Sequence, residues 1–310
     1  MKKQTLLFFT PLLLLAAAAQ GQVVFIGGAQ SDSLGWEANW DNTFPSLANP
    51  GNIDKDALWN WRMNNLVNNW GVNHTEGAIN LNGTNAVLQG GTIWSMSGGS
   101  FAASTNHDLR VENEATFNLS SGSVSVHALR VTGAESSFNQ SGGSVIATNG
   151  FVGGLAGAAY NLSGGSFQTT SINYNSTVFN LSGGSLTLTA LNTSANSDRI
   201  RLWTVSGNVT MTVTAASGIG VDRFNFANNW LPTATGATLT VSGWGQTEFE
   251  ELFSTGRFQY DGENLNATQF AEIFQVSGST LSIIPEPSTY AAIFGLMVLG
   301  LAAWRRRLTR

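Results

Sequence analysis

A short motif, Ser-Gly-Gly-Ser or a near copy of it, recurs through the middle of the chain at nearly even spacing. The copies begin at Ser97, Ser120, Ser141, Ser163 and Ser182, with a degenerate copy at Ser206. Their starting positions are 23, 21, 22, 19 and 24 residues apart. A repeat of this length is one supersecondary unit, which buries its apolar face only by stacking on its neighbours. The repeat therefore predicts a solenoid for the middle of the chain.

The residues just before each motif alternate in character. An aromatic residue stands three positions before the motif, and four of the copies place an asparagine after it. The aromatic residues include Phe117, Phe138, Tyr160 and Phe179, and the asparagines are Asn118, Asn139, Asn161 and Asn180. Such alternation is typical of a half-buried strand with aromatic side chains inside and amides outside. We expect one aromatic stack with an asparagine ladder beside it.

Apolar residues resume after the glycines, at Phe101, Val124, Val145, Phe167 and Leu186. A third apolar pair follows in the clearer copies, so each repeat contains about three short strands, with the glycines at a corner that needs positive φ or close backbone approach. This content predicts an all-β fold, a right-handed parallel β-helix with capping segments. A β-sandwich of short strands is the alternative.

The repeats occupy residues 92–220. The segments on either side of them are expected to cap the solenoid. Residues 22–91 are rich in asparagine and tryptophan, and residues 36–41 are similar to the leading segments of autotransporter-like surface β-helices. The tryptophans are Trp36, Trp40, Trp59, Trp61 and Trp70. They are interpreted as the core of an N-terminal cap with the first coils, and a carbohydrate-binding platform is the alternative.

Residues 221–284 are expected to form the C-terminal cap. Residues 247–250 have capping-box spacing, and Phe249, Leu252 and Phe253 fall on one helical face before Gly256. Residues 269–274 predict a second short amphipathic turn, and residues 276–284 predict one strand.

The N-terminus has the pattern of a secretory signal peptide. Lys2 and Lys3 precede an apolar run over residues 6–19, and small residues follow. We expect residues 1–21 to be removed by signal peptidase between Gly21 and Gln22. A retained membrane helix is the less favoured interpretation, because the run is short for a membrane span.

The C-terminus, residues 285–310, combines three elements. Pro285-Glu286-Pro287 precedes an apolar stretch over residues 290–304, and Arg305, Arg306 and Arg307 follow. Fifteen helical residues span about 22 Å, a short transmembrane helix whose arginines should stay cytoplasmic. The order of the elements resembles the PEP-CTERM sorting signal. The resemblance implies processing by an exosortase and delivery to the cell envelope, the surface or an exopolysaccharide matrix, with exopolysaccharide as a candidate partner.

Composition narrows the chemistry. The chain has no cysteine, which excludes disulfides and thiolate sites. Removing both ends takes away six of the 14 basic residues and one of the 19 acidic residues, so the exported part has a net charge of about −10. This charge argues against nucleic acid as a partner.

One doublet is a candidate for chemistry. His107, Asp108, Arg110 and Glu112 in one repeat are followed by His127 and Arg130 in the next, with Glu114 and Glu135 nearby. Stacked imidazoles could hold a metal ion, or the group could hold an acidic sugar. We favour solvent-facing polar positions of a repeat, because the third copy, at Asn149-Gly150, lacks both histidine and arginine.

The sequence therefore predicts an exported, non-catalytic structural protein of the cell surface or extracellular matrix, with no cofactor and no metal. A carbohydrate-active β-helix enzyme or glycan-binding protein is the first alternative, because that fold includes polysaccharide lyases and hydrolases. A self-associating adhesin is the second, because an uncapped solenoid edge invites strand addition.

Overall fold

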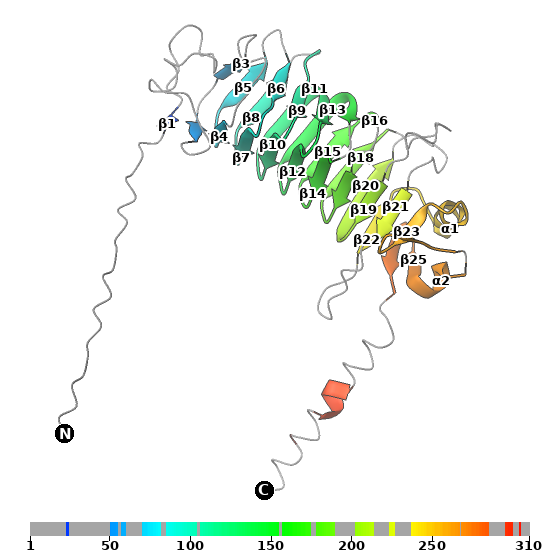
Figure 1. Cartoon of the computed structure of the whole chain (residues 1–310). Helices are drawn as coiled ribbons and strands as arrows, with labels where there is room; N and C mark the ends of the chain where they lie inside the picture. Colours follow the sequence, from blue (N-terminus) through cyan, green and yellow to red (C-terminus); the bar gives the residue numbers. More distant parts are fainter. Residues whose placement is uncertain are drawn as a thin grey trace, which may run out of the picture.

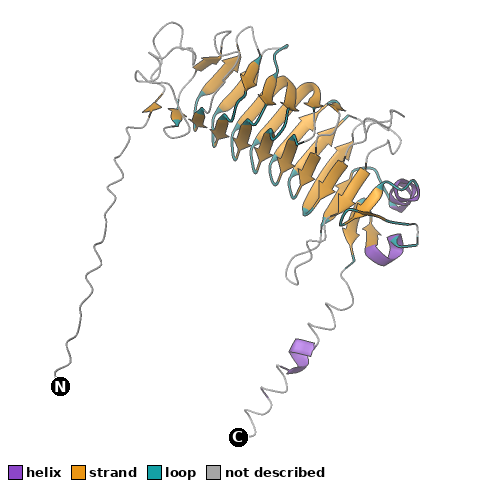
Figure 2. Ribbon diagram, viewed as in Figure 1, coloured by secondary structure: helices purple, strands orange, loops and turns teal. Residues whose placement is uncertain are grey.

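The computed structural model describes residues 23–24, 50–54, 57–59, 70–81, 85–103, 106–154, 157–174, 178–189, 202–213, 223–226, 237–266, 268–284, 295–299 and 304. Most of these residues form a long stack of short strands, with two helices at the C-terminal end of the stack (Figures 1 and 2).

The first sheet takes one strand from each successive level of the stack. In spatial order it contains β1 (Val23–Val24), β2 (Gly51–Ile53), β4 (Gly71–His74), β7 (Ile93–Met96), β10 (Thr116–Leu119), β12 (Ser137–Gln140), β14 (Ala159–Leu162), β17 (Val178–Leu181), β19 (Leu202–Val205), β21 (Arg223–Phe226), β23 (Phe258–Tyr260) and β24 (Glu263–Asn264).

The second sheet is built from the strands that follow the glycine corners. In spatial order it contains β3 (Ala57–Trp59), β5 (Ala78–Leu81), β8 (Ser100–Ala103), β11 (Ser123–Thr132), β13 (Ser144–Gly153), β15 (Ser166–Thr169), β18 (Ser185–Leu188), β20 (Asn208–Val213), β22 (Thr238–Val241), β26 (Thr280–Ile283) and β25 (Phe274–Ser277). A branch supplies the third strand of several levels. It runs through β6 (Ala86–Leu88), β9 (Leu109–Glu112), the second halves of β11 and β13, and β16 (Ile172–Tyr174).

The pairings from β1 to β23 and from β3 to β22 are parallel, and the β11–β13 pairing contains one shift of register, between Val126 and Ala128. The six repeats lie on six successive levels, and further levels precede and follow them. The predicted parallel β-solenoid is therefore confirmed, and the β-sandwich alternative is wrong, because a sandwich is built from antiparallel sheets.

The predicted aromatic stack forms the core. Phe117 and Phe138 are stacked with ring centroids 4.9 Å apart, Tyr160 follows at 5.2 Å from Phe138, and Phe179 lies 6.0 Å from Tyr160. All four side chains are buried. The column extends at both ends, to Trp94, Trp203, Phe224 and Phe258. Like residues recur at one level spacing because each ring packs on the ring below it.

The predicted asparagine ladder lies beside the aromatic column. The Nδ2 of Asn139 donates to the Oδ1 of Asn118 at 2.9 Å, and Asn161 and Asn180 repeat the contact at 2.6 and 2.7 Å. Asn73 and Asn52 form the same bond two levels earlier, at 3.1 Å. Asn139 and Asn161 therefore each donate one bond and accept another along the stack, so these outward amides bond to one another.

The glycine corners bring neighbouring levels into close contact. The glycine at the third position of the motif has positive φ, as at Gly122 (87°), Gly143 (65°) and Gly165 (76°). At the first glycine, a Cβ added to Gly142 or Gly164 would meet the carbonyl oxygen of Ser120 or Ser141 on the level before. Both predicted reasons for glycine at the corner are confirmed.

One inward position departs from the apolar pattern. Gln140 is 1% exposed and occupies the column held by Leu119 and Leu162 on the adjacent levels. Its Oε1 accepts a hydrogen bond of 2.5 Å from the hydroxyl of Tyr160, and its Nε2 donates to the carbonyl oxygen of Ser166 at 2.9 Å. The polar atom that tyrosine adds to the aromatic column is thus satisfied by the one glutamine beside it.

The C-terminal cap differs from its prediction in two details. Helix α1 (Gln246–Ser254) buries Phe249, Leu252 and Phe253 as expected, but Gly245 is its N-cap and Glu248 bonds the Gly245 N–H at 2.8 Å. The helix therefore begins before the predicted 247–250 box. Helix α2 (Phe270–Ile273) confirms the second turn.

The single strand predicted over residues 276–284 is wrong. The chain forms the antiparallel hairpin β25–β26, because Gly278 adopts φ 59° and reverses it. β26 also pairs antiparallel with β22, so this hairpin ends the parallel stack of the second sheet.

The two predicted targeting segments fall largely outside the described residues. The structure does not describe residues 1–21, Gln22, Pro285, Glu286, Pro287 or the three arginines from Arg305 to Arg307. Residues 295–299 are helical, and the side chains of Leu296, Met297, Val298 and Leu299 are exposed. Among the described residues, no helix has the length and apolar character needed to span a bilayer.

Candidate functional site

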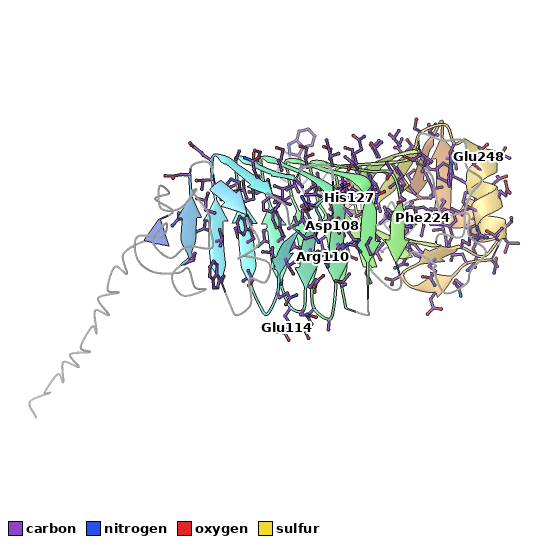
Figure 3. The ribbon with its side chains drawn as sticks, turned by 90° about the horizontal axis from the view of Figure 1, so that it is seen from above. Asp108, Arg110, Glu114, His127, Phe224 and Glu248 are labelled. Carbon is purple, nitrogen blue, oxygen red and sulfur yellow. The ribbon has the colours of Figure 1, made fainter. Side chains whose placement is uncertain are left out.

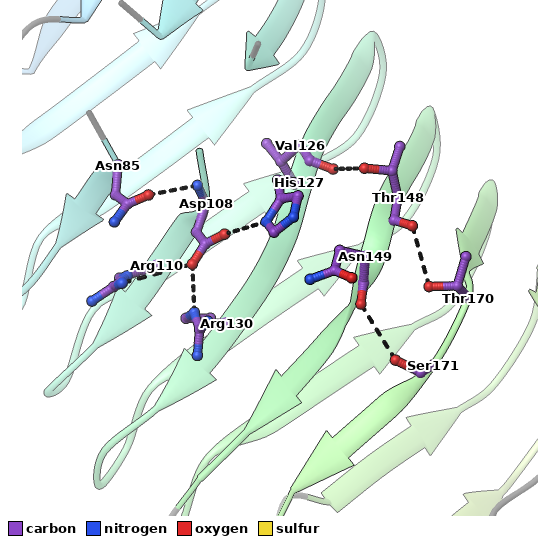
Figure 4. A network of polar contacts seen from close by, with 10 residues as sticks. All are labelled: Asn85, Asp108, Arg110, Val126, His127, Arg130, Thr148, Asn149, Thr170 and Ser171. Atoms are coloured by element: carbon purple, nitrogen blue, oxygen red, sulfur yellow. Dashed lines mark hydrogen bonds and ion pairs between the residues drawn. The ribbon is translucent and has the colours of Figure 1, made fainter. Parts of the chain in front are cut away.

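The predicted doublet lies on the third strand of two adjacent levels. Arg110 of β9 and Arg130 of β11 are register partners, and the backbone N–H of His127 bonds the carbonyl oxygen of His107. The expected stacking of like residues is therefore confirmed for the backbone. Figure 4 places Asp108 between the side chains of His127, Arg110 and Arg130.

Asp108 is the centre of the cluster. Its Oδ2 accepts a hydrogen bond from Nε of Arg130 at 2.6 Å, and its Oδ1 contacts Nδ1 of His127 at 3.2 Å (Figure 4). Arg110 is the third partner, with its Nη2 3.7 Å from Oδ2. The Asp108 backbone N–H bonds Oδ1 of Asn85 on the preceding level at 2.8 Å. The carboxylate therefore links two levels and is itself held in place.

The surroundings of Asp108 keep it charged. Burial alone would raise its pKa, but the hydrogen bonds from Arg130 and His127 and the charges of Arg130 and Arg110 outweigh burial, so the pKa lies below its usual range. A carboxyl group in this state is a poor general acid near neutral pH, because a general acid must hold a proton to deliver.

The two guanidinium groups keep unused hydrogen-bonding capacity. Their side chains are 35% and 34% exposed, while that of Asp108 is only 7% exposed. The Nε of Arg110 is buried and has no hydrogen-bond partner among the described residues. Each guanidinium carries five N–H donors, and a single carboxylate engages few of those ten. Donors of Arg110 and Arg130 therefore remain available to a further acceptor.

The remaining acidic candidates are not gathered at this point. Glu112 accepts a hydrogen bond from Nε2 of Gln89 at 3.1 Å, and Glu114 and Glu135 occupy turns with positive φ. Glu114 lies apart from Asp108 in Figure 3. In the part of the chain that the structure describes, no three residues of metal-ligating type come together. Nδ1 of His127 contacts Asp108, which leaves only Nε2 of that ring for another partner.

A β-bulge sets the shape of the surface next to the cluster. Between β11 and β13 the register shifts, so that Thr148 and Asn149 of one level face the single residue His127 of the other. The Thr148 hydroxyl bonds the carbonyl oxygen of Val126, and the Thr170 hydroxyl bonds the carbonyl oxygen of Thr148 (Figure 4). A row of threonines therefore continues from the cluster across the following levels.

This row borders a groove of about 200 Å³ on β13, β15 and β18. Its lining has no charged residue, and consists of Ile146, Ala147, Thr148, Gln168, Thr169, Thr170, Thr187, Leu188 and Thr189. No sequence motif marks the groove. The threonines lie far apart in the sequence, and the register of the levels brings them to one surface. Their recurrence after Val145, Phe167 and Leu186 is the sequence signal that could have indicated the groove.

The tryptophan-rich segment is described only in part. Trp70 is half-buried and packs against the core, as the cap interpretation predicts. Trp59 lies in β3, and Trp36, Trp40 and Trp61 lie outside the described residues. The carbohydrate-platform alternative therefore stays a prediction.

Comparison with known proteins identifies no relative. No family model, no curated protein and no solved structure matches the chain.

Proposed function

We propose that the protein is an exported, non-catalytic structural component of the cell envelope, cell surface or extracellular matrix, built on a right-handed parallel β-helix. A signal peptide at residues 1–21 starts its export. A tail resembling the PEP-CTERM signal, residues 285–310, anchors it in the inner membrane until an exosortase removes the tail.

One observation carries the structural part of this proposal. The residues that recur in the repeat bond to their own counterparts on the next level, ring on ring and amide on amide. The ring columns form the core, and the asparagine columns bond the outward side chains of the sheet to one another. Stacking of successive levels therefore accounts for the repeated residues, and no catalytic role is needed to explain them.

The sorting part rests on the order of the C-terminal elements and on the exposed apolar residues near them. Leu296, Val298 and Leu299 are 71%, 62% and 67% exposed. Apolar side chains exposed together on one helical segment need an apolar environment, which a bilayer provides. The arginines that follow suit the cytoplasmic face.

The test is processing and location in a bacterium that carries an exosortase. We expect the wild-type chain to lose its tail and reach the envelope or matrix fraction. A variant with Pro285→Ala and Pro287→Ala should keep the tail and stay in the inner membrane. Immunoblots against the solenoid and against a C-terminal epitope, on fractionated cells, measure both outcomes.

A Pro232→Ala variant is the matched control, because it removes a proline outside both targeting segments. It should be processed like the wild type. A wild-type chain that keeps its tail, or a Pro285/Pro287 variant that is sorted normally, would refute the sorting proposal.

A further inference from the structure

The exported part of the chain is strongly acidic, yet two of its few basic residues lie side by side. The β9–β11 register places Arg110 directly next to Arg130, about 4.8 Å away along the stack. Like charges in contact are unfavourable unless a counter-charge offsets them. Asp108 supplies one negative charge to the two guanidinium groups, so these three side chains together carry one positive charge.

The unused donors of the pair suit a planar anion. Both arginine side chains are about one-third exposed, so a ligand can approach them from solvent, although the Arg110 Nε itself is buried and out of its reach. A guanidinium presents paired N–H groups in a rigid fork that matches the two oxygens of a carboxylate. The pair therefore has the chemistry to bind a second carboxylate from solvent, in addition to that of Asp108.

The groove next to the pair has the chemistry of a sugar surface. The cluster continues from His127 to Thr148 and Thr170, and the groove beyond them is lined by hydroxyl, amide and aliphatic groups with no charge. The Gln168 amide and the Thr187 hydroxyl make no hydrogen bond to another described residue, so both can bond a ligand. Hydroxyl groups recur at the level spacing, which is comparable to the length of one sugar unit in an extended chain.

The groove is too small to enclose a drug-sized ligand. At about 200 Å³ it is smaller than the roughly 300–1,000 Å³ that encloses a drug-sized ligand. Such a groove suits one segment of a polymer whose remaining units extend into solvent.

From these observations we propose that Arg110, Arg130 and the adjoining threonine groove form a binding site for an acidic polysaccharide. A uronate carboxylate would bind the arginine pair, and neighbouring sugar units would lie along Thr148, Thr170 and Gln168. The net negative charge of the exported part repels a polyanion only weakly, because physiological salt screens charges that lie more than about 8 Å from the site.

The inference rests on the proposed extracellular location, where such polymers occur, but it is tested separately. Full-length protein in a mild non-ionic detergent is immobilised and exposed to a galacturonate oligosaccharide, and to the same oligosaccharide after reduction of its carboxyl groups to alcohols. We expect saturable binding of the galacturonate form and at least tenfold weaker binding of the reduced form. The galacturonate form should also be recovered uncleaved.

Arg110→Gln is the decisive variant, because Arg110 makes only a 3.7 Å contact with Asp108 and its loss leaves the bonds from Arg130 and His127 in place. It should weaken galacturonate binding about tenfold. Arg257→Gln, which makes the same charge change near the C-terminal cap, should have no effect. Thr170→Val, which keeps the side-chain volume, should weaken both oligosaccharides, and circular dichroism confirms that each variant is folded.

Absence of galacturonate binding, equal binding of the reduced form, or equal effects of Arg110→Gln and Arg257→Gln would each overturn the site. None of these results would alter the processing of the C-terminal tail. A chain that binds galacturonate but is not sorted would instead overturn the proposed location and leave the site intact.

Discussion

Replacing Tyr160 by Phe isolates the cost of one hydroxyl in the solenoid core. The ring stays in the aromatic column between Phe138 and Phe179, so no cavity forms. The change removes the 2.5 Å hydrogen bond to Oε1 of Gln140, and Gln140 is 1% exposed, so water cannot replace the lost donor. A buried acceptor left without a partner costs about 1–3 kcal/mol, and we expect that loss in the free energy of unfolding.

Gln140→Leu makes the converse change. It leaves the Tyr160 hydroxyl buried alone and removes the donor to the Ser166 carbonyl oxygen, so it should also cost about 1–3 kcal/mol. The double variant recreates the Leu and Phe pair found one level earlier, at Leu119 and Phe138. Its loss should be smaller than the sum of the single losses by about 1–3 kcal/mol, because removing both partners leaves little unsatisfied.

Urea unfolding of the full-length chain, followed by circular dichroism, measures the three variants. The midpoints are compared where the slope is unchanged, since a changed slope signals a different unfolding process. Gln168→Leu, an outward-facing glutamine on β15, is the control and should change stability by less than about 0.5 kcal/mol. Strictly additive losses would refute the coupling between Gln140 and Tyr160.

Two further predictions concern the corner and the first levels. Gly142→Ala should destabilise the chain by about 1–3 kcal/mol, because the new methyl group meets the Ser120 carbonyl oxygen. Gly295→Ala, where the surroundings are open, is the control and should not destabilise it. Urea unfolding midpoints measure both variants, and equal effects would contradict the corner explanation. Burial lowers the pKa of His74 below 6.5, so the unfolded chain takes up a proton that the folded chain refuses, and the His74 contribution to stability should fall as pH drops below about 6.5. Thermal unfolding between neutral and mildly acidic pH measures how steeply stability falls with pH. His74→Met, which matches Met96 in the same column, should make this pH dependence weaker. An unchanged pH dependence would refute the role given to His74.

The elements that follow from the repeat could be predicted from sequence. A period near 20 residues, with an aromatic residue, an asparagine and a glycine pair at fixed offsets, leaves few ways to bury the rings other than stacking them. Phe117 on Phe138 and Asn139 on Asn118 therefore follow directly. The same logic found the helical face of Phe249, Leu252 and Phe253, since 3.6-residue periodicity is a local property.

What could not be predicted depends on single departures from the pattern. Gln140 breaks the apolar column, and its reason is Tyr160 one level later, a contact that local alternation does not reveal. The sequence places Asp108 among several acidic residues, but its position between Arg130 and His127 depends on how three side chains turn at a corner. The hairpin at Gly278 replaced a predicted strand because one positive φ reverses the chain.

The cross-level contacts have a consequence for how such a rod changes length over generations. Unequal exchange between two Ser-Gly-Gly-Ser copies would delete or duplicate whole levels and leave the cross-section intact, since each corner meets an equivalent corner. Two pairs resist this freedom: Gln140 needs Tyr160, and Asp108 needs Arg130, each on the next level. Insertions between those partners would strand a buried polar group, so tolerated changes in length should fall elsewhere in the rod.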